Sequence, residues 1–224
     1  MNHRDFLPLP ALTFKRLGYH FSDDGTPNLY GVRGRSPFMD LASLPPEFAS
    51  QTNKWDDIIG VFWKEDGYWH DLKYKGTTDP GDNHPEYDNR QRGVAVMKPG
   101  QYIEAYQLGD HRGHPALVNW GRCAPNYWRI VKVDARPVVK AEGSEYIGLN
   151  IHRARKHGET PDSVGPFSKG CQVVQDNEDF EALLATVEKC LSTGGRSTIM
   201  YLDYTLLTED QVFKLAEIPQ GGQA

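Results

Sequence analysis

Short runs in which hydrophobic and polar residues alternate, separated by glycine and proline, dominate the chain. This pattern is typical of many short β-strands joined by tight turns. The segment from Lys64 to Gly67 has the composition of a hairpin turn. We expect strands over residues 57–63, 68–74, 93–96, 103–108, 127–133, 148–152, 171–174 and 197–204.

Helical periodicity is strong at only one place, late in the chain. Between residues 179 and 191 the apolar side chains fall on one helix face: Phe180, Leu183, Leu184, Val187 and Leu191. Asp176 or Asn177 can cap this helix. A shorter helix is expected from Thr208 to about residue 218, because Thr208 and Gln211 form a capping-box pattern. The sequence therefore predicts a β-rich α+β fold with one main late helix.

The first 50 residues differ from the rest in composition. They contain six prolines and favour loops, with one short strand over residues 29–32. We expect residues 1–50 to be a loop-rich N-terminal extension and residues 51–224 to be the main domain. The apolar residues 6–14 are interrupted by Pro8 and Pro10 and lack a small-residue cleavage site, so we expect no export signal.

Composition excludes several classes of protein. Hydrophobic residues make up 38% of the chain, which is enough for a core and argues against general disorder. The 25 basic and 30 acidic residues leave a net charge of −5, which disfavours binding to nucleic acid or to anionic lipid. The longest nearly unbroken apolar run, residues 58–63, is far shorter than the ~20 residues of a membrane-spanning helix.

The three cysteines lie far apart, without the close pairs of a disulfide framework or a zinc knuckle. Cys190 falls on the apolar face of the predicted helix and is expected in the core. Cys123 lies in a proline-flanked loop and is expected to be incidental. Cys171, at the start of a predicted strand, is the candidate for chemistry.

A histidine and a cysteine terminate neighbouring predicted strands. His152 ends one strand, Cys171 opens the next, and an irregular loop joins them, so the imidazole can reach the thiol. An imidazolium beside a cysteine stabilises the thiolate, an arrangement suited to acyl transfer. Ser168 and Gly170 precede the cysteine in a tight segment, where backbone N–H groups can face a developing oxyanion.

Other histidines and the tryptophans have simpler interpretations. His111 and His114 resemble half of a zinc site, but the sequence has no HExxH motif, and we expect no metal. His111 is expected either to lie in a loop lining the cleft or to be structural. The five tryptophans are expected mostly in the core. Residues 79–92 are expected to form a solvated loop, with a mobile flap over the site as the alternative.

The spacing of the candidate residues resembles a known family. His152, fifteen intervening residues and then Ser168-Lys169-Gly170-Cys171 are similar to the active-site signature of L,D-transpeptidase catalytic domains, in which a histidine precedes Ser/Thr-His-Gly-Cys. The resemblance covers residues 56–204, including the glycine- and threonine-containing segment 76–81. Its Ser-x-Gly-Cys-Gln variant resembles a divergent branch found in phage and prophage genes. Lys169 replaces the family's histidine, and Val173 replaces its Asn or Arg.

The resemblance implies a β-sandwich fold and a set of roles. Cys171 would be the nucleophile and His152 its base, held by the backbone carbonyl of Arg153. The substrate would be a peptidoglycan stem peptide, cleaved at an L,D bond through a thioester, with no metal or organic cofactor. The residues expected to line the substrate site are Lys169, Gln172 and His111.

Three functions are compatible with these expectations. The first is a phage-type lytic or trimming enzyme, made in the cytoplasm and delivered to the wall by holin, virion or lysis. The second is an exported, cross-linking transpeptidase. The third is a non-catalytic wall-binding or virion structural module on the same fold.

Overall fold

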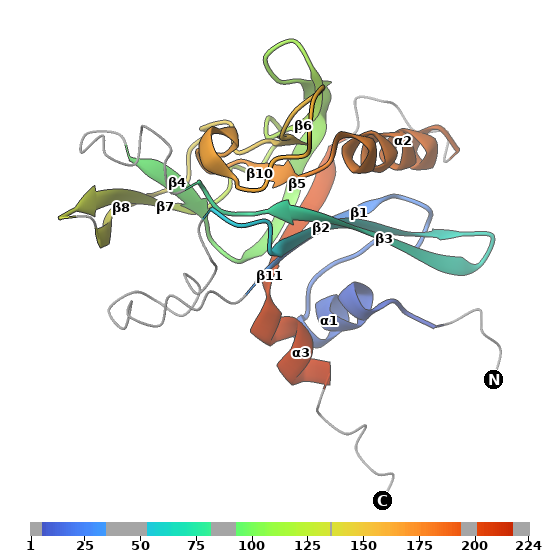
Figure 1. Ribbon diagram of the computed structural model, residues 1–224. Helices are drawn as coiled ribbons and strands as arrows, with labels where there is room; N and C mark the ends of the chain where they lie inside the picture. Colours follow the sequence, from blue (N-terminus) through green and yellow to red (C-terminus); the bar gives the residue numbers. More distant parts are fainter. Residues whose placement is uncertain (1–5, 35–52, 82–92, 135, 194–200, 217–224) are drawn as a thin grey trace, which may run out of the picture.

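The computed structural model describes residues 6–34, 53–81, 93–134, 136–193 and 201–216 (Figure 1). Among the described helices, none is both long enough and apolar enough to cross a membrane. The elements, in chain order, are α1 (Leu9–Leu17), β1 (Asn28–Arg33), β2 (Asp57–Glu65), β3 (Tyr68–Thr77), β4 (Val94–Met97), β5 (Gly100–Asp110), β6 (Pro115–Val118), β7 (Tyr127–Val133), β8 (Arg136–Gly143), β9 (Ile151–Arg153), the 3-10 turn η4 (Gly165–Phe167), β10 (Gln172–Val174), α2 (Asn177–Thr193), β11 (Leu202–Thr208) and α3 (Glu209–Ala216).

The main sheet closes into a barrel with the strand order β1-β11-β5-β6-β9-β10-β3-β2, and β4, β7 and β8 form a second, small sheet. The β1–β11 and β9–β10 pairs are parallel, and the other pairs in the barrel are antiparallel. The β-rich α+β class with a main late helix is confirmed. A closed barrel differs from the expected sandwich of two packed sheets.

Strand β1 is what closes the barrel. It pairs with β2 on one side and with β11 on the other, and all six of its residues are buried. The strand expected over residues 29–32 is confirmed, but it is an integral part of the barrel and not an element of a loop-rich extension. Residues 35–52, which complete the predicted extension, lie outside the described residues.

Helix α1 was not predicted, because Pro8 and Pro10 interrupt its apolar pattern. Both prolines lie at the helix start, Pro8 as the N-cap and Pro10 in the first turn, where a missing N–H costs no hydrogen bond. Helices α1 and α3 lie side by side against one face of the barrel (Figure 1). Their shared apolar cluster contains Ala11, Phe14, Tyr30, Val32, Phe62, Leu207 and Val212.

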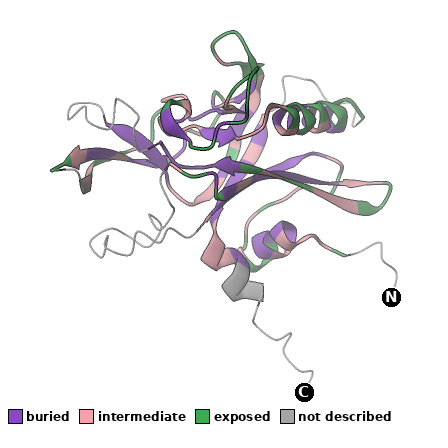
Figure 2. Cartoon of the chain, in the orientation of Figure 1, coloured by how far each residue is buried: buried purple, intermediate pink, exposed green. Residues whose placement is uncertain are grey.

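Helix α2 packs against the barrel through the face that the periodicity predicted, and its outer face is exposed (Figure 2). Cys190 is buried on this helix, as expected. The Glu178 N–H donates to Asp176 Oδ1 at 2.8 Å and so caps the first turn. Thr208 and Gln211 exchange hydrogen bonds between side chain and backbone at 2.9 and 3.3 Å, which confirms the capping box.

The strand predictions hold in part. Asp66 and Gly67 both have positive φ, 51° and 83°, and form the predicted turn between β2 and β3. Strands β6 and β8 were missed, since each carries a proline at or near its start. Of the predicted strand 197–204, residues 197–200 lie outside the described residues, and β11 runs from Leu202 to Thr208.

A buried guanidinium links the barrel to the second sheet. Arg33, at the end of β1, is 2% exposed and donates to the carbonyl oxygens of Met97 and Thr78 at 2.9 and 3.0 Å. It also pairs with Asp79 at 3.1 Å. Asp57 accepts two hydrogen bonds from Thr78, and burial together with the Asp79 carboxylate raises the pKa of Asp57 to about 7. One cation therefore faces two buried carboxyl groups.

Replacing this cation tests its structural role. Arg33→Met removes the charge at similar volume and leaves Asp57 and Asp79 buried without it, so we expect the free energy of unfolding to fall by about 3–5 kcal/mol. Urea denaturation measures the change. The control is Arg122→Met, which breaks an exposed pair with Glu104 and should cost less than about 1 kcal/mol. Equal effects of the two substitutions would contradict this account.

Candidate active site

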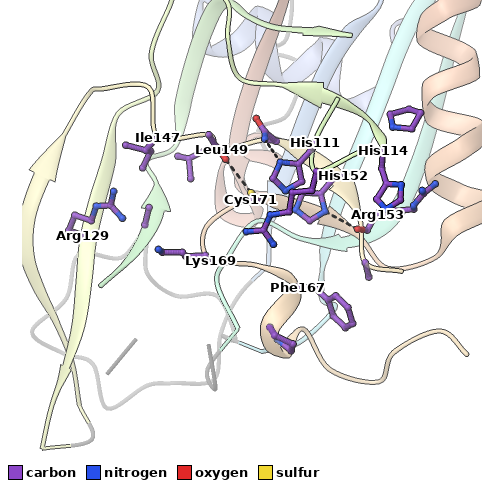
Figure 3. A pocket seen from close by; sticks show the side chains of 17 residues that line it. His111, His114, Arg129, Ile147, Leu149, His152, Arg153, Phe167, Lys169 and Cys171 are labelled. Atoms are coloured by element: carbon purple, nitrogen blue, oxygen red, sulfur yellow. Dashed lines mark hydrogen bonds between the residues drawn. The ribbon is translucent and has the colours of Figure 1, made fainter. Parts of the chain in front are cut away.

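Cys171 and His152 line one cavity of about 540 Å³ (Figure 3). The cavity lies between the barrel and the second sheet, because its lining includes Ala95 of β4 and Arg129 of β7 as well as the two candidate residues. The fold therefore brings the predicted nucleophile and the predicted base into the same site.

The parallel pairing of β9 and β10 produces this arrangement. Gln172 is opposite Ile151 and Val173 is opposite His152, and the Gln172 N–H donates to the carbonyl oxygen of Asn150 at 2.9 Å. Because the strands run in the same direction, the beginning of β10 lies beside the beginning of β9. Cys171 consequently lies next to residue 150, two residues before the histidine, and not against the end of β9.

The ring of His152 is held by its neighbour. Nδ1 lies 2.8 Å from the backbone carbonyl oxygen of Arg153, the group that the resemblance implies (Figure 3). A carbonyl only accepts hydrogen bonds, so Nδ1 carries the proton and Nε2 has the free lone pair. Burial lowers the pKa of His152 to about 4, although the bond to Arg153 opposes the shift. At neutral pH the imidazole is uncharged and can accept a proton.

Cys171 rests as a thiol in this environment. Its Sγ donates to the carbonyl oxygen of Gly148 at 3.3 Å. Burial raises the pKa of the thiol to about 11, opposed by the backbone N–H of Asn150 and by the charge of Arg112. The sequence analysis expected an imidazolium paired with a thiolate. The two pKa shifts favour an uncharged thiol and an uncharged imidazole instead, a neutral pair in one cavity, and the hydrogen bond of Sγ goes to Gly148 rather than to His152.

Ser168 and Gly170 hold the cysteine in place. The Ser168 hydroxyl donates to the carbonyl oxygen of Cys171 at 2.8 Å and accepts from the Gly170 N–H at 3.1 Å. Gly170 has a φ of 135°, and a Cβ there would lie 2.3 Å from the carbonyl oxygen of Ala95. The Gly170 N–H, one of the backbone groups expected near a developing oxyanion, is therefore already engaged by Ser168.

The residues expected to line the substrate site divide into two groups. Lys169 and His111 do line the cavity. Gln172 does not, because it is fully buried, accepts a hydrogen bond from the Tyr204 hydroxyl at 3.1 Å and lies inside the barrel. Alternation along β10 explains the correction, since the residue after Cys171 points to the opposite face.

Two features of the site were missed by the sequence analysis. Asn150 contacts His111 through its side chain, with Nδ2 of the amide 2.8 Å from Nδ1 of the ring. Among the described residues the cavity lining is also basic, and its charged members are Arg112, Arg129, Arg153 and Lys169, with no carboxylate. The sign of the lining favours an anionic ligand.

The two histidines that resemble half of a zinc site lie within the described residues. His111 and His114 both line the cavity, but no group of three or more His, Cys, Asp or Glu residues in the described ranges is arranged to hold a metal ion.

Comparisons of the chain with protein-family models, with curated proteins and with solved structures found no match. The chemical interpretation therefore depends on the geometry of the site and on the resemblance of its motif.

The neutral pair predicts how Cys171 reacts with iodoacetamide. Only the thiolate reacts with iodoacetamide. Because the pKa of the thiol is about 11, the alkylation rate should rise about tenfold per pH unit between about pH 6 and pH 9. His152→Ala should change the rate little, because the neutral imidazole contributes no thiolate. The measurement is mass spectrometry of a protein in which Cys123 and Cys190 are replaced by serine. A rate that is constant over this range and falls in His152→Ala would instead indicate an ion pair.

Proposed function

We propose that the protein is a cysteine acyltransferase or peptidase of L,D-transpeptidase type, which cleaves L,D peptide bonds in peptidoglycan stem peptides through a thioester on Cys171. The observation that carries the proposal is the placement of Cys171 and His152 in one cavity, with Nδ1 of His152 directed to the Arg153 carbonyl oxygen and Nε2 left as a base. In this proposal the barrel is a variant of the family's β-sandwich, and the pairing of β1 with β2 and β11 closes it.

The reaction begins from the neutral pair. As Sγ of Cys171 attacks the carbonyl carbon of the L,D bond, its proton passes to Nε2 of His152. The tetrahedral intermediate collapses, the C–N bond breaks, and the departing amine of the D-residue takes the proton from the imidazolium. Water or an acceptor amine then attacks the thioester and gives its proton to His152. The cysteine leaves and regains that proton, which completes the cycle.

The charge of the cavity supports a stem peptide as substrate. A stem peptide carries free carboxylates, and the described residues of the lining include four cationic side chains and no acidic one. One of the four, Arg153, has its guanidinium 3.8 Å from the carboxylate of Glu181, a residue that does not line the cavity. Arginine suits a carboxylate ligand because its guanidinium can donate two parallel hydrogen bonds.

Hydrolysis and cross-linking differ only in whether water or an amine resolves the thioester. We propose a phage-type lytic or trimming activity, on the basis of the resemblance of the Ser-x-Gly-Cys-Gln segment.

A non-catalytic wall-binding or virion module is the second candidate. The raised pKa of Cys171 and the replacement of the family's histidine by Lys169 favour it.

The proposal predicts which substitutions abolish turnover of purified muropeptides. Cys171→Ala should lower product formation by several orders of magnitude, because the covalent step is lost. His152→Ala should also lower it, by about 100-fold or more, through loss of the general base. Mass spectrometry distinguishes loss of a D-residue, cleavage of a cross-link and dimer formation.

Cys123→Ala is the matched control, since this half-buried thiol is not among the residues lining the cavity. It should retain wild-type turnover, and circular dichroism should show that all three variants fold. Product formation by Cys171→Ala above about one per cent of wild type would rule out the thioester mechanism.

A further inference from the structure

The side chain of Asn150 fixes the tautomer of His111. The backbone N–H of Asn119 donates to Oδ1 of Asn150 at 2.8 Å, and because a backbone N–H only donates, this contact assigns the two ends of the amide. The NH₂ group of Asn150 therefore faces Nδ1 of His111, at 2.8 Å. Nδ1 must accept, so the neutral ring carries its hydrogen on Nε2.

His111 is also held rigidly. It begins the turn between β5 and β6, where its N–H donates to the His114 carbonyl oxygen at 2.8 Å and its own carbonyl oxygen accepts in return at 3.2 Å. The Gly113 N–H donates to Asp110 Oδ1 at 2.7 Å and tightens the same turn. Burial and the charge of Arg112 lower the pKa of His111, which keeps the ring neutral.

The ring lies against His152 in the cavity. It stacks on His152 with a centroid distance of 4.8 Å and an angle of 22° between the ring planes, and both rings line the cavity beside Cys171 (Figure 3). Nε2 of His111 has no hydrogen-bond partner within the part of the chain that the structure describes. The site thus contains an oriented N–H donor whose partner is not a described protein group.

Acyl transfer at Cys171 creates a need for such a donor. Attack by sulfur places negative charge on the former carbonyl oxygen, and the Gly170 N–H is already bonded to Ser168. We propose that His111 is a catalytic residue whose Nε2–H donates to this oxyanion, and that Asn150 is the positioning residue that holds the ring in the donating tautomer. This inference rests on the proposed acyl transfer at Cys171.

Two substitutions separate hydrogen-bond donation from ring stacking. His111→Gln keeps an N–H donor near the position of Nε2 but removes the ring, whereas His111→Phe keeps a ring that can stack on His152 but has no donor. The assay is acylation of Cys171 by p-nitrophenyl acetate, which forms a tetrahedral oxyanion and needs no stem peptide. Alkylation of Cys171 by iodoacetamide serves as the second readout, because it forms no oxyanion.

We expect His111→Phe to lower the acylation rate by about 100-fold and to leave the alkylation rate at the wild-type value. His111→Gln should retain acylation within about tenfold of wild type. Equal losses in the two variants, a larger loss in His111→Gln, no loss in His111→Phe or a parallel fall in alkylation would overturn the proposal. Absence of Cys171-dependent acylation in the wild type would instead refute the proposed function itself.

The tautomer can be measured independently of activity. ¹⁵N NMR of histidine-labelled protein should show His111 protonated on Nε2 and unprotonated on Nδ1 at pH 7. In Asn150→Asp the carboxylate can only accept, so the hydrogen should move to Nδ1, and acylation should fall as it does in His111→Phe. A His111 ring protonated on Nδ1 in the wild type would contradict the role of Asn150.

Discussion

The parallel pairing of two three-residue strands, β9 and β10, is the constraint on which the site depends. A parallel pair needs a crossover connection, and residues 154–171 provide it while carrying the segment that holds Cys171. Strands this short are not stable alone. They are fixed because β10 also pairs with β3 and β9 also pairs with β6, within a barrel that β1 closes. The positions of Cys171 and His152 are thus properties of the whole barrel.

A series of polar contacts and short chain segments connects the buried Arg33 to the segment that holds Cys171. Arg33 holds Thr78 and Asp79, just before Gly81, whose N–H donates to the Ser168 carbonyl oxygen at 3.0 Å. The Ser168 hydroxyl in turn accepts from the Gly170 N–H and donates to the carbonyl oxygen of Cys171. A Cβ at Gly81 would lie 1.9 Å from the Gly165 carbonyl oxygen, so the crossover packs directly on this loop. The contacts of the buried charge are therefore continuous with the loop on which the segment holding Cys171 packs.

Local signals in the sequence predicted the local features. The period of 3.6 predicted the buried face of α2, and the placement of His152 and Cys171 at neighbouring strands predicted that they share a cavity. Long-range pairing has no local signature, so the role of β1 was not predicted. The meeting of Asn150 with His111 was missed for the same reason, since it joins segments 39 residues apart. One signal was available: Asn150 precedes His152 by two residues, and in a strand such positions share a face.

In the proposed function, a neutral thiol and a neutral imidazole require proton transfer during attack, and the central claim is that this attack forms a covalent bond to Cys171. Rapid-quench mass spectrometry tests it most directly, with enzyme in excess over a stem tetrapeptide so that only the first turnover occurs. We predict that the peptide containing Cys171 gains the mass of the acyl portion, without the terminal D-residue, and loses it in hydroxylamine. Consumption of the substrate while Cys171 stays unmodified, or an adduct on another residue, would contradict the account.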